Sequence, residues 1–108
     1  RELLTLQLDP FFHVDAAPTV EHALAMVAKG PPYDAVLCDL MMPRGGAESW
    51  LARCGDLDPR LDERTILLTA GPTTHAATEL VEVRREKVLF KPVDMADLRP
   101  MIERIARP

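Results

Sequence analysis

Three polar residues could together form a phosphoryl-transfer site, because each ends an apolar segment with the pattern of a buried strand. Asp39 ends DAVLCD, Thr69 ends TILLT and Lys91 ends VLFK. A carboxylate can act as a nucleophile toward a phosphoryl group and form an aspartyl phosphate. Positive charge and hydrogen-bond donors then stabilise the phosphoryl oxygens, and Lys91 and Thr69 would supply them. A single Asp at a strand end is often only a turn cap, so the prediction depends on the three residues together.

The elements that must position these residues alternate along the chain. Apolar runs and alternating patterns predict strands at residues 11–17, 34–39, 64–70 and 87–91. Helical spacing predicts helices over about 20–29, 46–57, 74–85 and 95–105, after the tail of a helix at 1–8. We expect Thr19, Thr73 or Thr74, and Asp94 to cap three of these helices, and Pro100 to bend the last one.

Strands alternating with helices predict an α/β fold with a mostly parallel sheet and helices on both faces. In such folds chemistry takes place at the carboxyl ends of the strands, where all three candidate residues are expected.

Composition limits the remaining possibilities. A chain of 108 residues is expected to form one domain, and its formal net charge of -4 argues against direct nucleic-acid binding. No apolar run is long enough for a membrane span and no signal peptide is visible, so we expect a cytoplasmic protein without membrane contact. Cys38 and Cys54 lack the spacing of a metal site and are expected to be buried thiols in a reducing compartment. Trp50 is expected to anchor a helix on the sheet.

The segments DLMMP, LLTAG and LFKP, in this order, resemble the signature of the receiver domain of bacterial two-component response regulators. The intervals from Asp39 to Thr69 and from Thr69 to Lys91 are those that the family uses, and the resemblance covers essentially the whole chain. It implies a flavodoxin-like doubly wound sheet of strand order 2-1-3-4-5. The part of the chain from DLMMP to LFKPVDMADLRPMI most resembles receivers attached to hybrid sensor histidine kinases.

The resemblance also implies roles for individual residues. Asp39 would accept a phosphoryl group from a histidine kinase or a phosphotransfer domain, in a reaction that the receiver catalyses on itself with Mg²⁺. Such a domain is no conventional enzyme, since it catalyses at most its own phosphorylation and dephosphorylation. Asp39 and the backbone carbonyl of Met41 would bind the metal, Thr69 would move toward the phosphoryl group, and Lys91 would pair with it. The Lys91–Pro92 peptide bond would be cis.

Two of the chain's departures from the family pattern bear most directly on function. The family's first strand, with the acidic pair that holds Mg²⁺, would lie before Arg1, so residues 1–108 are expected to be one receiver domain truncated at its N-terminus. That strand would lie between the strands at 11–17 and 34–39. Without its acidic residues we expect metal binding and phosphorylation to be lost. Val88 also stands where many receivers carry an aromatic switch residue.

Two other functions stay open. A pseudo-receiver would use the same fold as a docking or dimerisation module without phosphorylation, with a second copy of the chain as a candidate partner. A small flavodoxin-like enzyme could use Asp39 as a nucleophile, but it would need a second catalytic base or a deep pocket. The sequence contains no glycine-rich phosphate loop and no Asp-x-Asp pattern that would support this enzyme.

Overall fold

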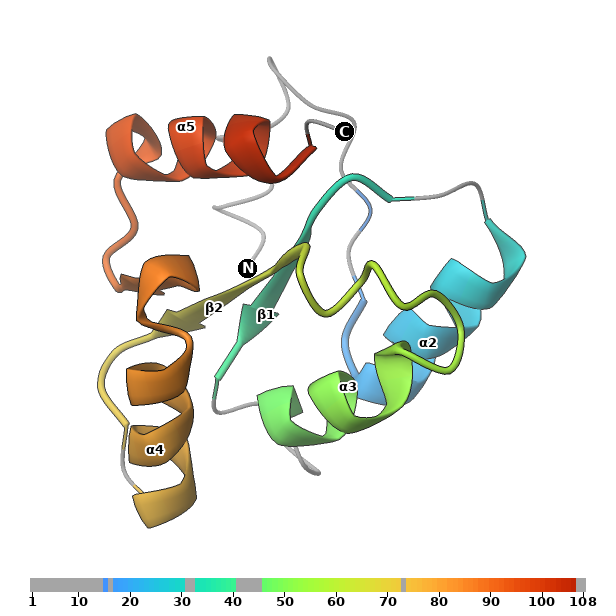
Figure 1. Cartoon of the computed structure of the whole chain (residues 1–108), viewed down its shortest axis with the longest axis horizontal. Helices are drawn as coiled ribbons and strands as arrows, with labels where there is room; N and C mark the ends of the chain where they lie inside the picture. Colours follow the sequence, from blue (N-terminus) through green and yellow to red (C-terminus); the bar gives the residue numbers. More distant parts are fainter. Residues whose placement is uncertain (1–14, 16, 31–32, 41–45, 73, 107–108) are drawn as a thin grey trace.

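The computed structural model describes residues 15, 17–30, 33–40, 46–72 and 74–106. Three parallel strands, β1 (Val36–Asp39), β2 (Thr65–Thr69) and β3 (Val88–Phe90), form a sheet in the order β1-β2-β3. The helices are α2 (Val20–Lys29), α3 (Gly46–Cys54), α4 (His75–Val83) and α5 (Met95–Ala106), with a short 3-10 helix η2 (Arg85–Lys87) before β3 (Figure 1). The predicted α/β class with a parallel sheet is confirmed.

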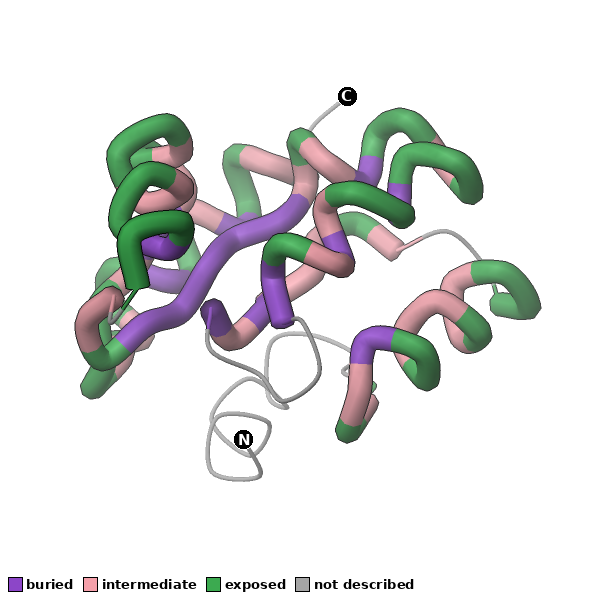
Figure 2. The backbone as a smooth tube through the Cα atoms, turned by 90° about the horizontal axis from the view of Figure 1, so that it is seen from below, coloured by how far each residue is buried: buried purple, intermediate pink, exposed green. Residues whose placement is uncertain are grey.

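The helices pack on both faces of the sheet and create two cores. On one face, α2, α3 and α4 contribute Val20, Trp50 and Ala77 to a cluster that includes Leu67 of β2. On the other face, α5 packs Leu98 and other apolar residues against Ile66 and Leu68. Burial is most complete along β2, where every residue is buried, whereas the outward turns of the helices are exposed (Figure 2). Successive residues of β2 therefore serve different cores, as the alternation of side chains along a strand requires.

The strand ends lie level with one another at the carboxyl edge of the sheet. Asp39 pairs with Leu68, and Thr69 pairs with Phe90. The ladder continues one residue beyond β1 and β3, since the Leu40 N–H donates to the Leu68 carbonyl at 2.8 Å and the Lys91 N–H donates to the Thr69 carbonyl at 2.7 Å. This register brings the three candidate residues to one edge.

Helix starts follow the predicted caps. The Thr19 hydroxyl accepts from the His22 N–H at 3.1 Å, and the Thr74 hydroxyl accepts from the Ala77 N–H at 3.0 Å. The Asp94 carboxylate accepts from the Ala96 N–H at 2.8 Å. These bonds satisfy amides that have no partner inside the helix. Helix α5 continues through Pro100, and the local bend expected there stays a prediction.

Two expectations differ from the structure. The second predicted helix, 46–57, ends at Cys54, because the chain turns through residues 55–57. The apolar run ending at Asp39 was expected to be covered on both faces, but in β1 only Cys38 is fully buried. Strand β1 has one partner, β2, within the described part of the sheet, so the prediction of complete burial was wrong for this part.

The predicted helix tail at 1–8 lies outside the described residues, as does most of the strand at 11–17. Of that strand only Asp15 and Ala17 are described, and neither belongs to a strand. The expected truncation of the domain stays a prediction. Among the described residues, no helix has the length and apolar character needed to cross a membrane.

Trp50 anchors α3 on the sheet, as expected. Its side chain is 1% exposed, and its indole N–H donates to the Thr65 hydroxyl at 2.9 Å. Thr65, also buried, donates in turn to the Leu61 carbonyl at 2.7 Å. A short chain of buried hydrogen bonds thus connects α3 with the start of β2, and each polar group in it has a partner.

Candidate functional site

The structure brings Asp39 and Lys91 into direct contact. The Lys91 ammonium donates to the Asp39 carboxylate with an Nζ–Oδ2 distance of 2.5 Å, and the two residues are far apart in sequence. Their side chains are 42% and 41% exposed, respectively. The Lys91–Pro92 peptide bond is cis, as predicted. A carboxylate and a cation therefore stand together at an edge that a partner protein can reach.

Thr69 lies on the neighbouring strand at the same edge and is 1% exposed. Its hydroxyl accepts a hydrogen bond from the Gly71 N–H at 2.9 Å. Gly71 has a φ of 138°, a region that favours glycine, so this residue type permits the turn that brings its amide back to Thr69. A threonine hydroxyl has one hydrogen to donate, and the Thr69 hydroxyl donates to no acceptor within the described residues. The Thr69 hydroxyl can therefore donate a hydrogen bond to an oxygen of an incoming group.

The magnesium ion that the family resemblance implies does not fit the described residues alone. Of the two expected metal ligands, Met41 lies outside the described residues. No group of three His, Cys, Asp or Glu side chains in the described part of the chain could hold a metal ion. Asp39 supplies one carboxylate, whereas Mg²⁺ requires a nearly octahedral set of oxygen ligands. A metal at this edge would need further acidic residues.

Cys38 lies directly before Asp39, and its thiol is held in the neutral, unreactive form. Burial raises the pKa of its thiol to about 12, and the negative charge of Asp39 adds to the effect. Burial also raises the pKa of the Cys54 thiol. Both cysteines are buried, as predicted, and the structure contains them as free thiols. A thiol reacts as its thiolate, so Cys38 is a poor nucleophile at this edge.

Two residues near the site differ in burial. Val88, where an aromatic switch residue was noted as absent, is 8% exposed and belongs to the core. Phe90, one residue before Lys91, is 56% exposed and was not singled out from the sequence. Burial falls along β3 from Val88 to Phe90, and the uniformly apolar sequence VLF carries no signal of this.

Arg84 is a second residue that sequence reasoning missed. Its guanidinium is 13% exposed and donates to Asp62 and to the Thr65 carbonyl. Its position one residue after α4, among other charged residues, gave no sign of burial in the sequence.

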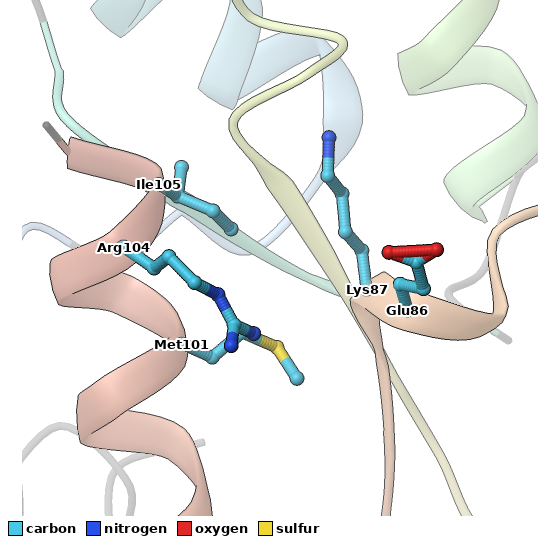
Figure 3. Close-up of a pocket in the computed structure, with 5 residues that line it drawn as sticks. All are labelled: Glu86, Lys87, Met101, Arg104 and Ile105. Carbon is cyan, nitrogen blue, oxygen red and sulfur yellow. The ribbon is translucent and has the colours of Figure 1, made fainter. Parts of the chain in front are cut away.

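An open hollow of about 450 Å³ lies at the opposite end of the sheet. It is formed between η2 and the second half of α5, and its lining residues are Glu86, Lys87, Met101, Arg104 and Ile105 (Figure 3). Because η2 directly precedes β3, this hollow lies at the amino end of that strand. None of Asp39, Thr69 and Lys91 lines it, so it is separate from the carboxylate–lysine pair.

The sequence matches one family of known proteins. The family model of the response regulator receiver domain matches residues 1–103. The crystal structure of adenylate cyclase from Rhodopirellula baltica is similar in fold, with a TM-score of 0.78 and 20% sequence identity. The match covers 97% of this chain and 77% of that one. No curated protein matches the sequence. At this level of identity the solved structure supports the fold alone.

Proposed function

Because the chain belongs to the response regulator receiver domain family, we propose that Asp39 accepts a phosphoryl group from a phosphohistidine. The donor would be a histidine kinase or a phosphotransfer protein in two-component signal transduction, and the reaction would take place in the cytoplasm. The observation that carries the proposal is the contact of 2.5 Å between the Lys91 ammonium and the Asp39 carboxylate, at an accessible strand edge. A nucleophile and a cation for the transferring group are thereby preassembled.

The proposed step uses groups of this edge. A carboxylate oxygen of Asp39 attacks phosphorus, the bond between phosphorus and the donor's histidine nitrogen breaks, and its electron pair stays on the departing imidazole. The product is an aspartyl phosphate, a mixed anhydride. Lys91 offsets the negative charge that accumulates on the phosphoryl oxygens, and the Thr69 hydroxyl can donate to one of them. The 42% exposure of the Asp39 side chain supports access by a donor protein.

The proposed reaction is also expected to depend on Mg²⁺. Receiver domains generally bind Mg²⁺ at an acidic pocket, but no group of three His, Cys, Asp or Glu side chains among the described residues could hold the ion. We therefore expect Mg²⁺ to bind, and phosphorylation to proceed, only if further acidic side chains complete the pocket. Titration calorimetry with Mg²⁺ tests this on the 108-residue chain and on a version carrying any residues that precede Arg1 in its gene. Tight Mg²⁺ binding by the 108-residue chain would contradict this expectation.

The experiment that tests the proposed function is intact mass spectrometry after incubation with Mg²⁺ and phosphoramidate, a small donor with a phosphorus–nitrogen bond. Both versions of the chain are compared with Asp39→Asn and with Asp34→Asn. Asp34 is an exposed carboxylate just before β1, so its substitution controls for a general loss of negative charge. In the version with completed metal ligands we expect a gain of about 80 Da, the mass of one phosphoryl group on an acceptor carboxylate, abolished by Asp39→Asn and kept in Asp34→Asn. The 108-residue chain by itself should show no gain.

The alternative outcome points to another function. A folded protein with completed metal ligands and no mass gain would reject the phosphoryl-accepting role. It would favour a pseudo-receiver that acts as a docking or dimerisation module.

A further inference from the structure

The hollow between η2 and the second half of α5 has charges of opposite sign on its two walls. Glu86 and Lys87 line it from η2, and Met101, Arg104 and Ile105 line it from α5 (Figure 3). Within the described part of the chain, Glu86 and Arg104 form no ion pair with each other or with another residue. Both charges are therefore available to a ligand that enters the hollow.

The η2 wall is held in place by its lysine. The Lys87 ammonium donates to the Glu63 carbonyl at 2.7 Å, which connects η2 to the segment before β2. The Lys87 N–H also donates to the Arg84 carbonyl at 2.7 Å. Because the Lys87 ammonium is already engaged, the cation that remains for a ligand is the exposed guanidinium of Arg104.

The α5 wall also supplies an apolar surface. Met101 and Ile105 are four residues apart, so they lie on the same face of the helix. Both pack against the core on that side of the sheet, yet both are only partly buried, so part of each side chain faces the hollow. Figure 3 shows the side chains of Met101 and Arg104 reaching from α5 toward η2. An apolar group that covers Met101 and Ile105 would thus lie beside a guanidinium.

The open shape of the hollow favours a peptide over a small molecule. A small-molecule pocket encloses most of the surface of its ligand. Here the charged residues of both walls, Glu86 and Arg104, are exposed, so a ligand would keep one side in solvent. Methionine and arginine are enriched at protein interfaces, and the flexible thioether of methionine adapts to an apolar side chain of a partner. A peptide can add affinity from contacts around the rim of the hollow.

We propose that this hollow is a docking site for a peptide segment of a partner protein, in which an apolar residue lies between an acidic and a basic residue. The apolar side chain packs on Met101 and Ile105, the carboxylate binds the Arg104 guanidinium, and the basic group faces Glu86. Arginine suits this task because its planar group can hold a carboxylate through two parallel hydrogen bonds. The hollow lies at the opposite end of the sheet from Asp39, so the proposal does not depend on the proposed function.

The test is an NMR titration of isotope-labelled protein, including any residues that precede Arg1, with a short blocked peptide. The peptide contains aspartate, leucine and lysine in a row, flanked by serines. We expect the amide signals of residues 85–88 and 101–105 to shift, while those of Asp39, Thr69 and Lys91 stay in place. Absence of binding at millimolar peptide, or shifts confined to other residues, would overturn the proposal.

Changes in the peptide separate the contributions of its side chains. Serine in place of the leucine should weaken binding about tenfold or more, because burial of the apolar side chain is lost. Asparagine in place of the aspartate should weaken binding about fivefold, the effect of one exposed ion pair. Equal binding of all three peptides would refute the recognition of an apolar and acidic segment.

Arg104→Gln assigns the carboxylate contact to one residue of the protein. This variant removes the charge at an exposed position, and we expect it to bind the aspartate and asparagine peptides equally. The control is Arg99→Gln, also on α5, because Arg99 is 48% exposed, pairs with Glu103 at 3.4 Å and does not line the hollow. It should keep the fivefold preference for aspartate. A preserved preference in Arg104→Gln would overturn the role given to Arg104.

Two further measurements test the second wall and another occupant. Glu86→Gln should abolish the preference for a peptide with lysine over the same peptide with glutamine at that position. An unchanged preference would refute the contact with Glu86. Amide signals of residues 101–105 that shift with protein concentration, without any peptide, would assign the hollow to a second copy of the chain and overturn the proposal.

Discussion

The ion pair between Lys91 and Asp39 is exposed to solvent, and this exposure limits its contribution to the stability of the fold. Both side chains are more than 40% exposed, so solvent screens the ion pair. Pairs of this kind contribute about 0–1 kcal/mol to the free energy of unfolding. The same charge next to a transferring phosphoryl group would act on a transition state, where stabilisation by one fixed donor is worth far more. We therefore expect Lys91 to matter for reaction rate rather than for stability.

The variant Lys91→Met tests whether the ammonium group affects the reaction rate rather than the stability of the fold. We expect the free energy of unfolding, measured by urea denaturation, to change by less than about 1 kcal/mol. The rate of phosphorylation, followed by intact mass in protein that accepts the phosphoryl group, should fall about a hundredfold. Lys29→Met, at the exposed end of α2, is the control and should leave both quantities unchanged. A wild-type rate in a folded Lys91→Met protein would contradict the role given to the ammonium group.

Cys38 gives a prediction about pH. Burial raises the pKa of its thiol to about 12 from 9.0. A thiol held neutral in the folded state stabilises the fold fully below the unfolded-state pKa, and this contribution is lost as pH rises from 9.0 toward about 12. We expect the free energy of unfolding to fall over that range, and to fall less in Cys38→Ala. At pH 8, alkylation of Cys38 by iodoacetamide should require unfolding, so rapid labelling of native protein would count against this assignment.

At the scale of elements, the contact between α3 and β2 depends on a buried hydroxyl. Thr65 accepts from the Trp50 indole and donates to the Leu61 carbonyl, so Thr65→Val removes two bonds while keeping a similar shape. The Leu61 carbonyl keeps the Arg64 N–H as a donor at 3.2 Å, so the Trp50 indole N–H is the group left without a partner. A buried polar group without a partner costs about 1–3 kcal/mol, and we expect a loss of that size in the free energy of unfolding. Thr78→Val, at an exposed threonine of α4, should cost less than about 1 kcal/mol in the same urea titration. Similar values for the two variants would contradict this account.

Elements were predictable from the sequence where local chemistry decides them. Thr19, Thr74 and Asp94 cap helices as expected, because a cap depends on residues within one turn. The burial of β1 was not predictable from its apolar run, because it depends on which segments lie beside it. The hydrogen bonds of Arg84 escaped prediction for the same reason: their acceptors belong to Asp62 and Thr65, which are distant in sequence.

At the scale of the whole molecule, the parallel sheet determines where the candidate site is. Alternation of strands and helices predicted that Asp39, Thr69 and Lys91 would share one edge, and the sheet order and register bring them there. The sequence could not predict the 2.5 Å contact between Asp39 and Lys91, since side-chain geometry depends on packing across three strands. The hollow at the other end of the sheet had no sequence signal, because η2 and α5 form it jointly.

The most direct test of the central claim is to locate the phosphoryl group by borohydride trapping. Borohydride reduces an aspartyl phosphate to homoserine, so the modified residue becomes lighter by about 14 Da and can be assigned by peptide sequencing in a mass spectrometer. The measurement uses protein treated with phosphoramidate and Mg²⁺, including any residues that precede Arg1. We predict homoserine at position 39 and at no other acidic residue. Homoserine at another position, with Asp39 unchanged, would contradict the assignment of Asp39 as the phosphoryl acceptor.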